Sequence, residues 1–137
     1  MAYWLLKSEP NKYSWDMLVA DGRTHWNGVR NYQASNNLKA MRRGEQAFFY
    51  HSVEGLAIVG IVEIVREYYP DPSDAQGRFG MVDVMPLRPL PRPVTLQQIK
   101  AEPRLRELAL VRQSRLSVVP VGPEEWRLIC AMGGGAS

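Results

Sequence analysis

The alternation of apolar and polar positions predicts short strands interleaved with short helices. Short apolar segments rich in β-branched or aromatic residues are predicted strands, at residues 2–7, 46–52, 57–68, 79–87 and 115–120. Cap residues and helical spacing predict helices over residues 14–20, 29–43 and 95–98, and onward from Pro103 and Pro123. Prolines in residues 86–93 are expected to end the fourth strand.

The spacing of apolar residues also indicates which faces are buried. Residues 57–68 are apolar at nearly every position, so both faces of this strand should be covered, as in a barrel or a sandwich. In the helix that begins near residue 29, an inner stripe recurs at helical spacing: Ala34, Leu38 and Met41. The outer face of the same helix is expected to carry Asn31, Ser35 and Lys39. These patterns predict an α+β fold with a mixed, β-centred sheet.

The composition is that of an ordinary globular protein. Of 137 residues, 45% are hydrophobic and 23% are charged, which suffices for one core without disulfides or a structural metal. We expect one domain over residues 1–132 and a flexible glycine-rich tail over residues 133–137. The single cysteine, Cys130, excludes an internal disulfide framework and a multi-cysteine zinc site. Without a long apolar run or a cleavable signal pattern, the chain is expected to be cytoplasmic and to have no membrane partner.

Positive charge is concentrated in one part of the chain. The net charge is only +3, but residues 86–120 carry seven basic and two acidic side chains. Such a block suits a polyanion, but charge alone favours the interpretation as a solvated helical face. If nucleic acid is the partner, contacts to its phosphates are expected from Lys39, Arg42, Arg43, Arg104, Arg106 and Arg112.

We find no catalytic constellation in the sequence. His51 and Ser52 are neighbours on a strand and should point to opposite faces, so His51 is badly placed to activate Ser52. Two histidines are too few for a histidine-rich metal site. Asp71 and Asp74 lie in a proline-rich loop, where turn chemistry explains them. We therefore expect a non-enzymatic protein with no metal and no cofactor.

Three polar clusters are better suited to binding. Residues 26–32 place an aromatic side chain, a glycine and hydrogen-bonding groups just before a helix, where an anion or a base can be held. Residues 50–52 end a strand with three hydrogen-bonding groups, and residues 113–117 lead into another strand. Each cluster also has a structural explanation: Trp26 as a core aromatic, Arg30 as a surface ion pair, and Ser114 and Ser117 as turn caps.

Five stretches resemble the EVE domain family: YWLLKSEP at 3–10, WNGVRNYQASNNLKAM at 26–41, FFYHS at 48–52, YPDP at 69–72 and LVRQSRLSVVPV at 110–121. The resemblance implies a PUA-like fold, a closed β-barrel-like mixed sheet with flanking short helices. It also implies a pocket for a modified nucleobase, either modified cytosine in DNA or a modified base in RNA. The implied pocket residues are Lys7, Ser8, Glu9, Trp26, Asn27, Val29, Arg30, Asn31, Tyr32, Tyr50, His51, Ser52, Ser114, Arg115 and Ser117.

One position departs from the family pattern. Ser35 stands where relatives commonly carry arginine, on the face of the helix that we expect to point outward. The departure is expected to weaken a phosphate contact and to leave the pocket undisturbed.

These observations favour a monomeric, non-enzymatic binder of modified bases in DNA or RNA. In this hypothesis Trp26 stacks on the base, and Arg30 and Arg115 meet phosphate or a base edge. Hydrogen bonds to the base are expected from Ser8, Asn31, Tyr50 and Ser52. Two alternatives stay open: a sensor of a free nucleotide or other small ligand, and a hydrolytic or base-modifying enzyme that uses His51 with Asp83 or Glu9.

Overall fold

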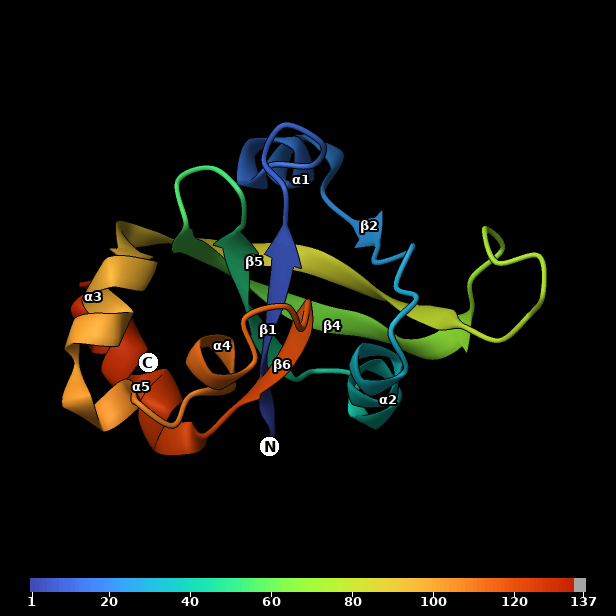
Figure 1. The fold of residues 1–137 in the computed structure, drawn as a ribbon. Coiled ribbons are helices and arrows are strands. Elements are labelled where there is room, and N and C mark those ends of the chain that lie inside the picture. The colour runs from blue at the N-terminus through green and yellow to red at the C-terminus, as the bar shows by residue number, and fades with distance from the viewer. Residues whose placement is uncertain (135–137) are drawn as a thin grey trace.

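The computed structural model describes residues 1–134, which fold around a six-stranded mixed sheet (Figure 1). In chain order the strands are β1 (Tyr3–Ser8), β2 (Thr24–His25), β3 (Gln46–His51), β4 (Ala57–Pro70), β5 (Gly80–Thr95) and β6 (Val118–Val121). Across the sheet they are ordered β2-β5-β4-β3-β1-β6. β1 and β3 run parallel, and the other neighbouring pairs are antiparallel. The α+β class with a mixed sheet is confirmed.

Short helices flank this sheet. They are α1 (Trp15–Asp21), α2 (Tyr32–Ala40), α3 (Leu96–Ala101), the 3-10 helix η1 (Pro103–Leu105), α4 (Ala109–Arg112) and α5 (Pro123–Met132). Figure 1 shows α1 beyond the end of β1, and α3 with α5 on the side opposite the long β4–β5 loop. Among residues 1–134, no helix has the length and apolar character needed to cross a bilayer.

The sheet is not closed, contrary to the barrel-like expectation. Its outer strands, β2 and β6, are not paired with each other. β2 is two residues long and pairs with β5 at Val84 and Asp83, so it is too short to carry the ladder around to β6. Helices lie beside the β6 edge instead, and the Asn37 side-chain amide of α2 donates to the Val118 carbonyl at 2.7 Å. An edge covered in this way is protected from pairing with another chain.

The prolines of residues 86–93 do not end the strand predicted at residues 79–87, which is β5 and continues to Thr95. Pro86 lies opposite Val62 and Pro89 opposite Gly60, where the register of the β4–β5 pair shifts. In the described chain, β2 pairs with β5 no further along than Val84. Beyond Val84, the side of β5 that faces away from β4 therefore has no strand partner. Proline is tolerated at such open edges and at bulges, because the backbone N–H that it lacks is not needed there for pairing.

Local helix signals are confirmed, with shifted boundaries. Ser14 caps α1, and Thr95 with Gln98 forms a capping box at α3. The second helix starts at Tyr32, because Asn31 is its N-cap and accepts the Ala34 N–H at 2.9 Å. Likewise β6 begins at Val118 instead of residue 115.

Ser35 is not on an outer face. It is 2% exposed, and its Oγ lies 3.3 Å from Tyr68 Oη. The long β4 strand reaches past α2 and covers this side of the helix, so a residue at position 35 faces the protein interior. The expectation that Ser35 lies on the outer face was wrong, and the expected weakening of a phosphate contact stays a prediction.

The C-terminal tail is described in part. Residues 135–137 of the predicted flexible tail lie outside the described residues. Gly133 accepts the Arg92 main-chain N–H at 2.9 Å, so the chain is held to β5 at that point.

Candidate functional site

The motifs that are far apart in the sequence meet at one end of the central strands. Parallel pairing of β1 with β3 sets Ser8 beside His51, and the Ser52 N–H donates to the Ser8 carbonyl at 2.9 Å. On the other side of β1, the Lys7 N–H donates to the Ser117 carbonyl at 3.0 Å. Three of the polar segments therefore converge where these strands end.

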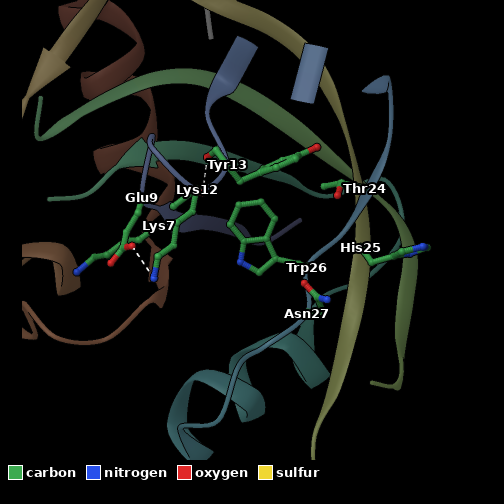
Figure 2. A pocket seen from close by; sticks show the side chains of 9 residues that line it. Lys7, Glu9, Lys12, Tyr13, Thr24, His25, Trp26 and Asn27 are labelled. Carbon is green, nitrogen blue, oxygen red and sulfur yellow. Dashed lines mark hydrogen bonds and ion pairs between the residues drawn. The ribbon is translucent and has the colours of Figure 1, made fainter. Parts of the chain in front are cut away.

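Trp26 brings the fourth segment to this place. Its main-chain N–H donates to the Val82 carbonyl at 2.8 Å, which continues the β2–β5 pairing. The indole is 9% exposed and packs edge-on against Phe49, with ring centroids 5.7 Å apart. Figure 2 shows the same ring at the centre of a cavity wall. Trp26 is thus a core aromatic on one side and a pocket residue on the other.

We call this space the Trp26 cavity. It has a volume of about 380 Å³ and is lined by Lys7, Ser8, Glu9, Lys12, Tyr13, Thr24, His25, Trp26 and Asn27. The five of these that the sequence predicted are Lys7, Ser8, Glu9, Trp26 and Asn27. The other four adjoin the predicted motifs in sequence, which is the signal that would have found them. A concave site with an aromatic wall and several polar groups is the usual form of a ligand pocket.

Polar groups in the Trp26 cavity are partly engaged with the protein itself. Ser8 Oγ donates to the Tyr13 carbonyl at 2.5 Å, and Glu9 pairs with Lys12 at 3.0 Å. Lys7 Nζ donates to the Ser114 carbonyl at 2.8 Å. Burial lowers the pKa of Lys7 because a charged ammonium loses hydration there. The cavity therefore contains two lysines whose ammonium groups are held in place, and Figure 2 shows both on the side of the indole opposite His25.

A second cavity, which we call the Arg115 cavity, adjoins the first. It has a volume of about 360 Å³ and is lined by Asn31, Gln33, Gln113, Ser114, Arg115 and Leu116. Its two walls are joined by a hydrogen bond from Gln33 Nε2 to Gln113 Oε1, at 2.8 Å. The structure therefore divides the predicted pocket, because Asn31, Ser114 and Arg115 line a space separate from that of Trp26.

Other predicted pocket residues line neither cavity. Val29 and Tyr50 are buried, and Tyr32 is exposed and packs on Phe79 at 4.8 Å. His51 Nε2 accepts the Trp15 N–H at 3.1 Å. Burial lowers the pKa of His51 and raises the pKa of Tyr50. Roles for these residues, and for Ser52 and Ser117, stay predictions.

Arg30 is held away from both cavities by a buried carboxylate. Its guanidinium lies 3.2 Å from Asp71 and donates to Ser73 Oγ at 3.0 Å. The Asp71 side chain is fully buried and also accepts the N–H groups of Gly28 and Ser73, both at 2.8 Å. Burial alone would raise the pKa of Asp71, but hydrogen bonds from Ser73, Gly28 and Arg30 outweigh it and lower the pKa to about 2.

Asp71 is thus more than a turn residue. It ties the β4–β5 loop to the segment that carries Trp26 and Asn27, which sequence reasoning missed. A buried acid in a proline-rich loop has no distinguishing local pattern, so the sequence offered little signal for this role.

The residues named in the enzyme hypothesis have other partners in the structure. Asp83 is buried and bound by Tyr69 Oη at 2.5 Å, while His25 Nδ1 lies 2.9 Å away. Within residues 1–134, no hydrogen bond or ion pair joins His51 to Asp83 or to Glu9. The same residues hold no group of three or more potential metal ligands.

The predicted phosphate contacts are spread over several surfaces, and none lines the Trp26 cavity. Arg104 pairs with Glu102 and Arg112 with Glu107 at 2.9 Å, while Arg42 lies 3.9 Å from Glu67. Lys39 lies over the Tyr68 ring, 5.4 Å from its centroid. Arg43 and Arg106 are exposed. The part of these side chains in binding stays a prediction.

The chain is similar in sequence and in structure to known proteins. The EVE domain model matches residues 2–132. Thymocyte nuclear protein 1 of Gallus gallus is 38% identical over 95% of this chain and 68% of its own length. A solved protein of Rhodopseudomonas palustris is 58% identical with a TM-score of 0.93, over 98% of this chain and 94% of that chain. Human THYN1, solved in complex with DNA containing 5-methylcytosine, is 33% identical with a TM-score of 0.92 over 100% of both chains.

Proposed function

The chain belongs to the EVE domain family, and from this premise we propose that it binds DNA and recognises a modified cytosine in the Trp26 cavity. The observation that carries the proposal is the cavity itself, in which an aromatic wall and polar groups surround a space of about 380 Å³. The human relative, 33% identical, was solved with DNA containing 5-methylcytosine. That ligand supports DNA over RNA as the partner.

The recognised base must leave the duplex stack to enter the cavity. Extrusion costs a few kcal/mol unless the base is already unpaired. Stacking on an aromatic side chain returns roughly 1–3 kcal/mol per base, and the cavity-facing side of Trp26 is the group placed to provide it. We therefore expect single-stranded and mismatched sites to bind more tightly than the same base in a perfect duplex.

Polar groups around Trp26 are proposed to read the edges of the base. Asn27 supplies an amide that can both donate and accept, and Lys7 Nζ is fixed by its bond to the Ser114 carbonyl. Ser8 Oγ already donates to Tyr13 and retains its capacity to accept. These residues differ in part from those that the sequence predicted to hydrogen-bond the base, because Asn31 and Tyr50 do not line this cavity.

The kind of modification should set the strength of the preference. A methyl group adds about 0.8 kcal/mol of apolar burial, roughly fourfold in affinity. A hydroxymethyl group that hydrogen-bonds to a buried partner is discriminated more sharply, because its omission leaves that partner unsatisfied. We propose a modest preference for 5-methylcytosine over cytosine and a larger one for hydroxylated cytosine.

The test is a fluorescence-anisotropy titration at fixed salt. Labelled single- and double-stranded DNA would carry cytosine, 5-methylcytosine or 5-hydroxymethylcytosine at one site, with matched RNA alongside. We expect Trp26→Ala to lose the dependence on modification and about tenfold or more of the affinity, because stacking is removed. Trp26→Phe should retain part of both.

Tyr32→Ala is the matched comparison, since Tyr32 is an exposed aromatic of the same segment that lines neither cavity. If the Trp26 cavity is the site, this variant should keep the dependence on modification, and a loss equal to that of Trp26→Ala would instead give Tyr32 its implied place in the pocket. Circular dichroism would establish that each variant is folded. Equal affinity for modified and unmodified DNA would contradict the proposal. Equal affinity for the free modified nucleotide and for DNA would instead favour a small-ligand sensor, and stronger binding to modified RNA would identify the other polymer.

A further inference from the structure

We propose that the Arg115 cavity is a second nucleotide subsite, which holds the phosphodiester and the nucleotide next to the recognised base. The inference rests on the proposed function, because it takes the recognised base to occupy the Trp26 cavity. It adds a path for the bound DNA strand, which would run from the Trp26 cavity across Lys7 to Arg115.

Lys7 connects the two cavities. It lines the first, and its Nζ donates to the carbonyl of Ser114, which lines the second, at 2.8 Å. One of the three ammonium hydrogens is used in this bond, so the others remain for a ligand. A cation fixed at the border between two concave sites is well placed to meet the phosphate that joins two nucleotides.

The lining of the second cavity suits a nucleotide. Gln33 and Gln113 bond to each other through one donor and one acceptor, and each amide keeps further hydrogen-bonding capacity. Leu116, which is 5% exposed, is the apolar residue of the lining. Amide groups both donate and accept hydrogen bonds, so they can hold a sugar or the edge of any base without selecting strongly among bases.

Arg115 differs from its basic neighbours. Arg104 and Arg112 are neutralised by Glu102 and Glu107, whereas no carboxylate of the described residues forms an ion pair with Arg115. Its guanidinium is exposed and can present two parallel N–H groups to a phosphate. Of the basic block at 86–120, Arg115 is therefore the side chain that combines an uncompensated charge with a place in the cavity beside Lys7.

The segment that carries this cavity is anchored before any ligand arrives. The Leu116 N–H donates to the Gln113 carbonyl at 3.0 Å, and the Ser117 carbonyl accepts from the Lys7 N–H at 3.0 Å. A site held by main-chain bonds on both sides loses little conformational entropy on binding. The two cavities are thus kept at a constant separation.

The experiment pairs a protein variant with a change in one phosphate. A short single-stranded DNA with one 5-hydroxymethylcytosine would be prepared in three forms: unaltered, with an uncharged methylphosphonate on the 5′ side of the modified nucleotide, and with one on the 3′ side. Affinities would be measured by anisotropy for wild type, Arg115→Ala and the control Arg112→Ala. Arg112 is adjacent in the fold but already paired with Glu107 at 2.9 Å.

For wild type, we expect one of the two methylphosphonates to weaken binding by roughly three- to tenfold. Arg115→Ala should weaken binding to the unaltered strand by a similar factor. That methylphosphonate should then cost clearly less affinity than in wild type, because only Lys7 remains to meet the phosphate. Such non-additivity is the signature of two groups in direct contact. In Arg112→Ala, neutralising that phosphate should lower the affinity by the same factor as in wild type.

The subsite would be overturned if each methylphosphonate weakened the binding of Arg115→Ala by the same factor as it weakens the binding of wild type. So would affinities unaffected by either methylphosphonate. Failure of the proposed function is recognised separately, as equal binding of cytosine and hydroxymethylcytosine by the wild type in the unaltered strand.

Discussion

At the scale of single residues, the candidate site depends on buried charges more than on exposed ones. Asp71 holds Gly28 and Arg30, and Asp83 holds Arg23 and Tyr69 at 3.0 and 2.5 Å. Both carboxylates are buried, and for both the pKa is lowered because hydrogen bonds outweigh the effect of burial. Each ties β4 or β5 to the segment around Trp26.

Asp71→Asn is expected to destabilise the protein in a pH-dependent way. The folded-state pKa of Asp71 is about 2, below its ordinary 3.8, so its stabilising contribution is complete above about pH 4 and is lost as the pH falls toward 2. That shift corresponds to about 2 kcal/mol at neutral pH. Urea unfolding of wild type and variant should show a gap of this order at neutral pH, shrinking below about pH 4.

Asp74→Asn is the matched control for this loop. Asp74 accepts main-chain N–H groups of Gln76, Arg78 and Phe79 and makes no bond to residues 26–30 among those described. Its loss should leave the affinity for modified DNA unchanged, whereas Asp71→Asn should lower it by releasing Gly28. A stability gap for Asp71→Asn that stayed constant down to about pH 2 would show that the charge is not responsible.

At the scale of elements, the docking of α1 on the sheet shapes the first cavity. Trp15 begins α1 and packs edge-on against Phe49 of β3 with ring centroids 5.6 Å apart. Its ring lies directly over Gly60 of β4, where an added Cβ would come within 2.5 Å of the indole. Gly60 is needed for space, not for backbone conformation. Docked in this way, α1 holds the preceding segment that lines the Trp26 cavity with Lys12 and Tyr13.

Gly60→Ala is therefore expected to lower the free energy of unfolding by roughly 1–3 kcal/mol, the usual cost of overpacking. The same substitution in a Trp15→Phe background should cost less, because the smaller ring vacates part of the space. Chemical denaturation of the four proteins in this cycle would measure the difference. An equal cost in both backgrounds would place the strain elsewhere.

At the scale of the whole molecule, the count of 17 basic side chains overstates how much positive charge is free to act on DNA. Several arginines are neutralised in ion pairs, among them Arg104, Arg112 and, more loosely, Arg42. Three cations line the two cavities, and one of them, Lys12, is paired with Glu9 at 3.0 Å. The other two, Lys7 and Arg115, form no ion pair with a carboxylate of the described residues. Binding should therefore be local to the cavities and only mildly dependent on salt.

We expect the logarithm of affinity for single-stranded DNA to fall with the logarithm of salt concentration with a slope of about −1.4, which corresponds to about two phosphate contacts. Anisotropy titrations over a series of salt concentrations would give this slope. Arg115→Ala should make it shallower by about one contact, and Arg104→Ala should leave it unchanged. A much steeper slope that Arg104→Ala reduces would instead show that the whole basic block meets the backbone.

The sequence by itself determined the features that depend on neighbouring residues. Ser14 and Thr95 were identified as caps, and Trp126 and Ile129 as buried, because capping and helical spacing act over a few positions. The family motifs also indicated most of the segments that form the candidate site. These conclusions needed no knowledge of which strands pair.

Only the tertiary structure decided the rest, because the deciding contacts join residues far apart in the chain. Ser35 is buried by Tyr68, 33 positions away, and Asp71 binds Gly28 across 43 positions. The predicted pocket became two cavities because β1 lies between β3 and β6, which places Lys7 beside Ser114, 107 positions away. Side-chain type limits what a residue can do, but long-range pairing determines which partner it meets, and that pairing leaves no local pattern to read.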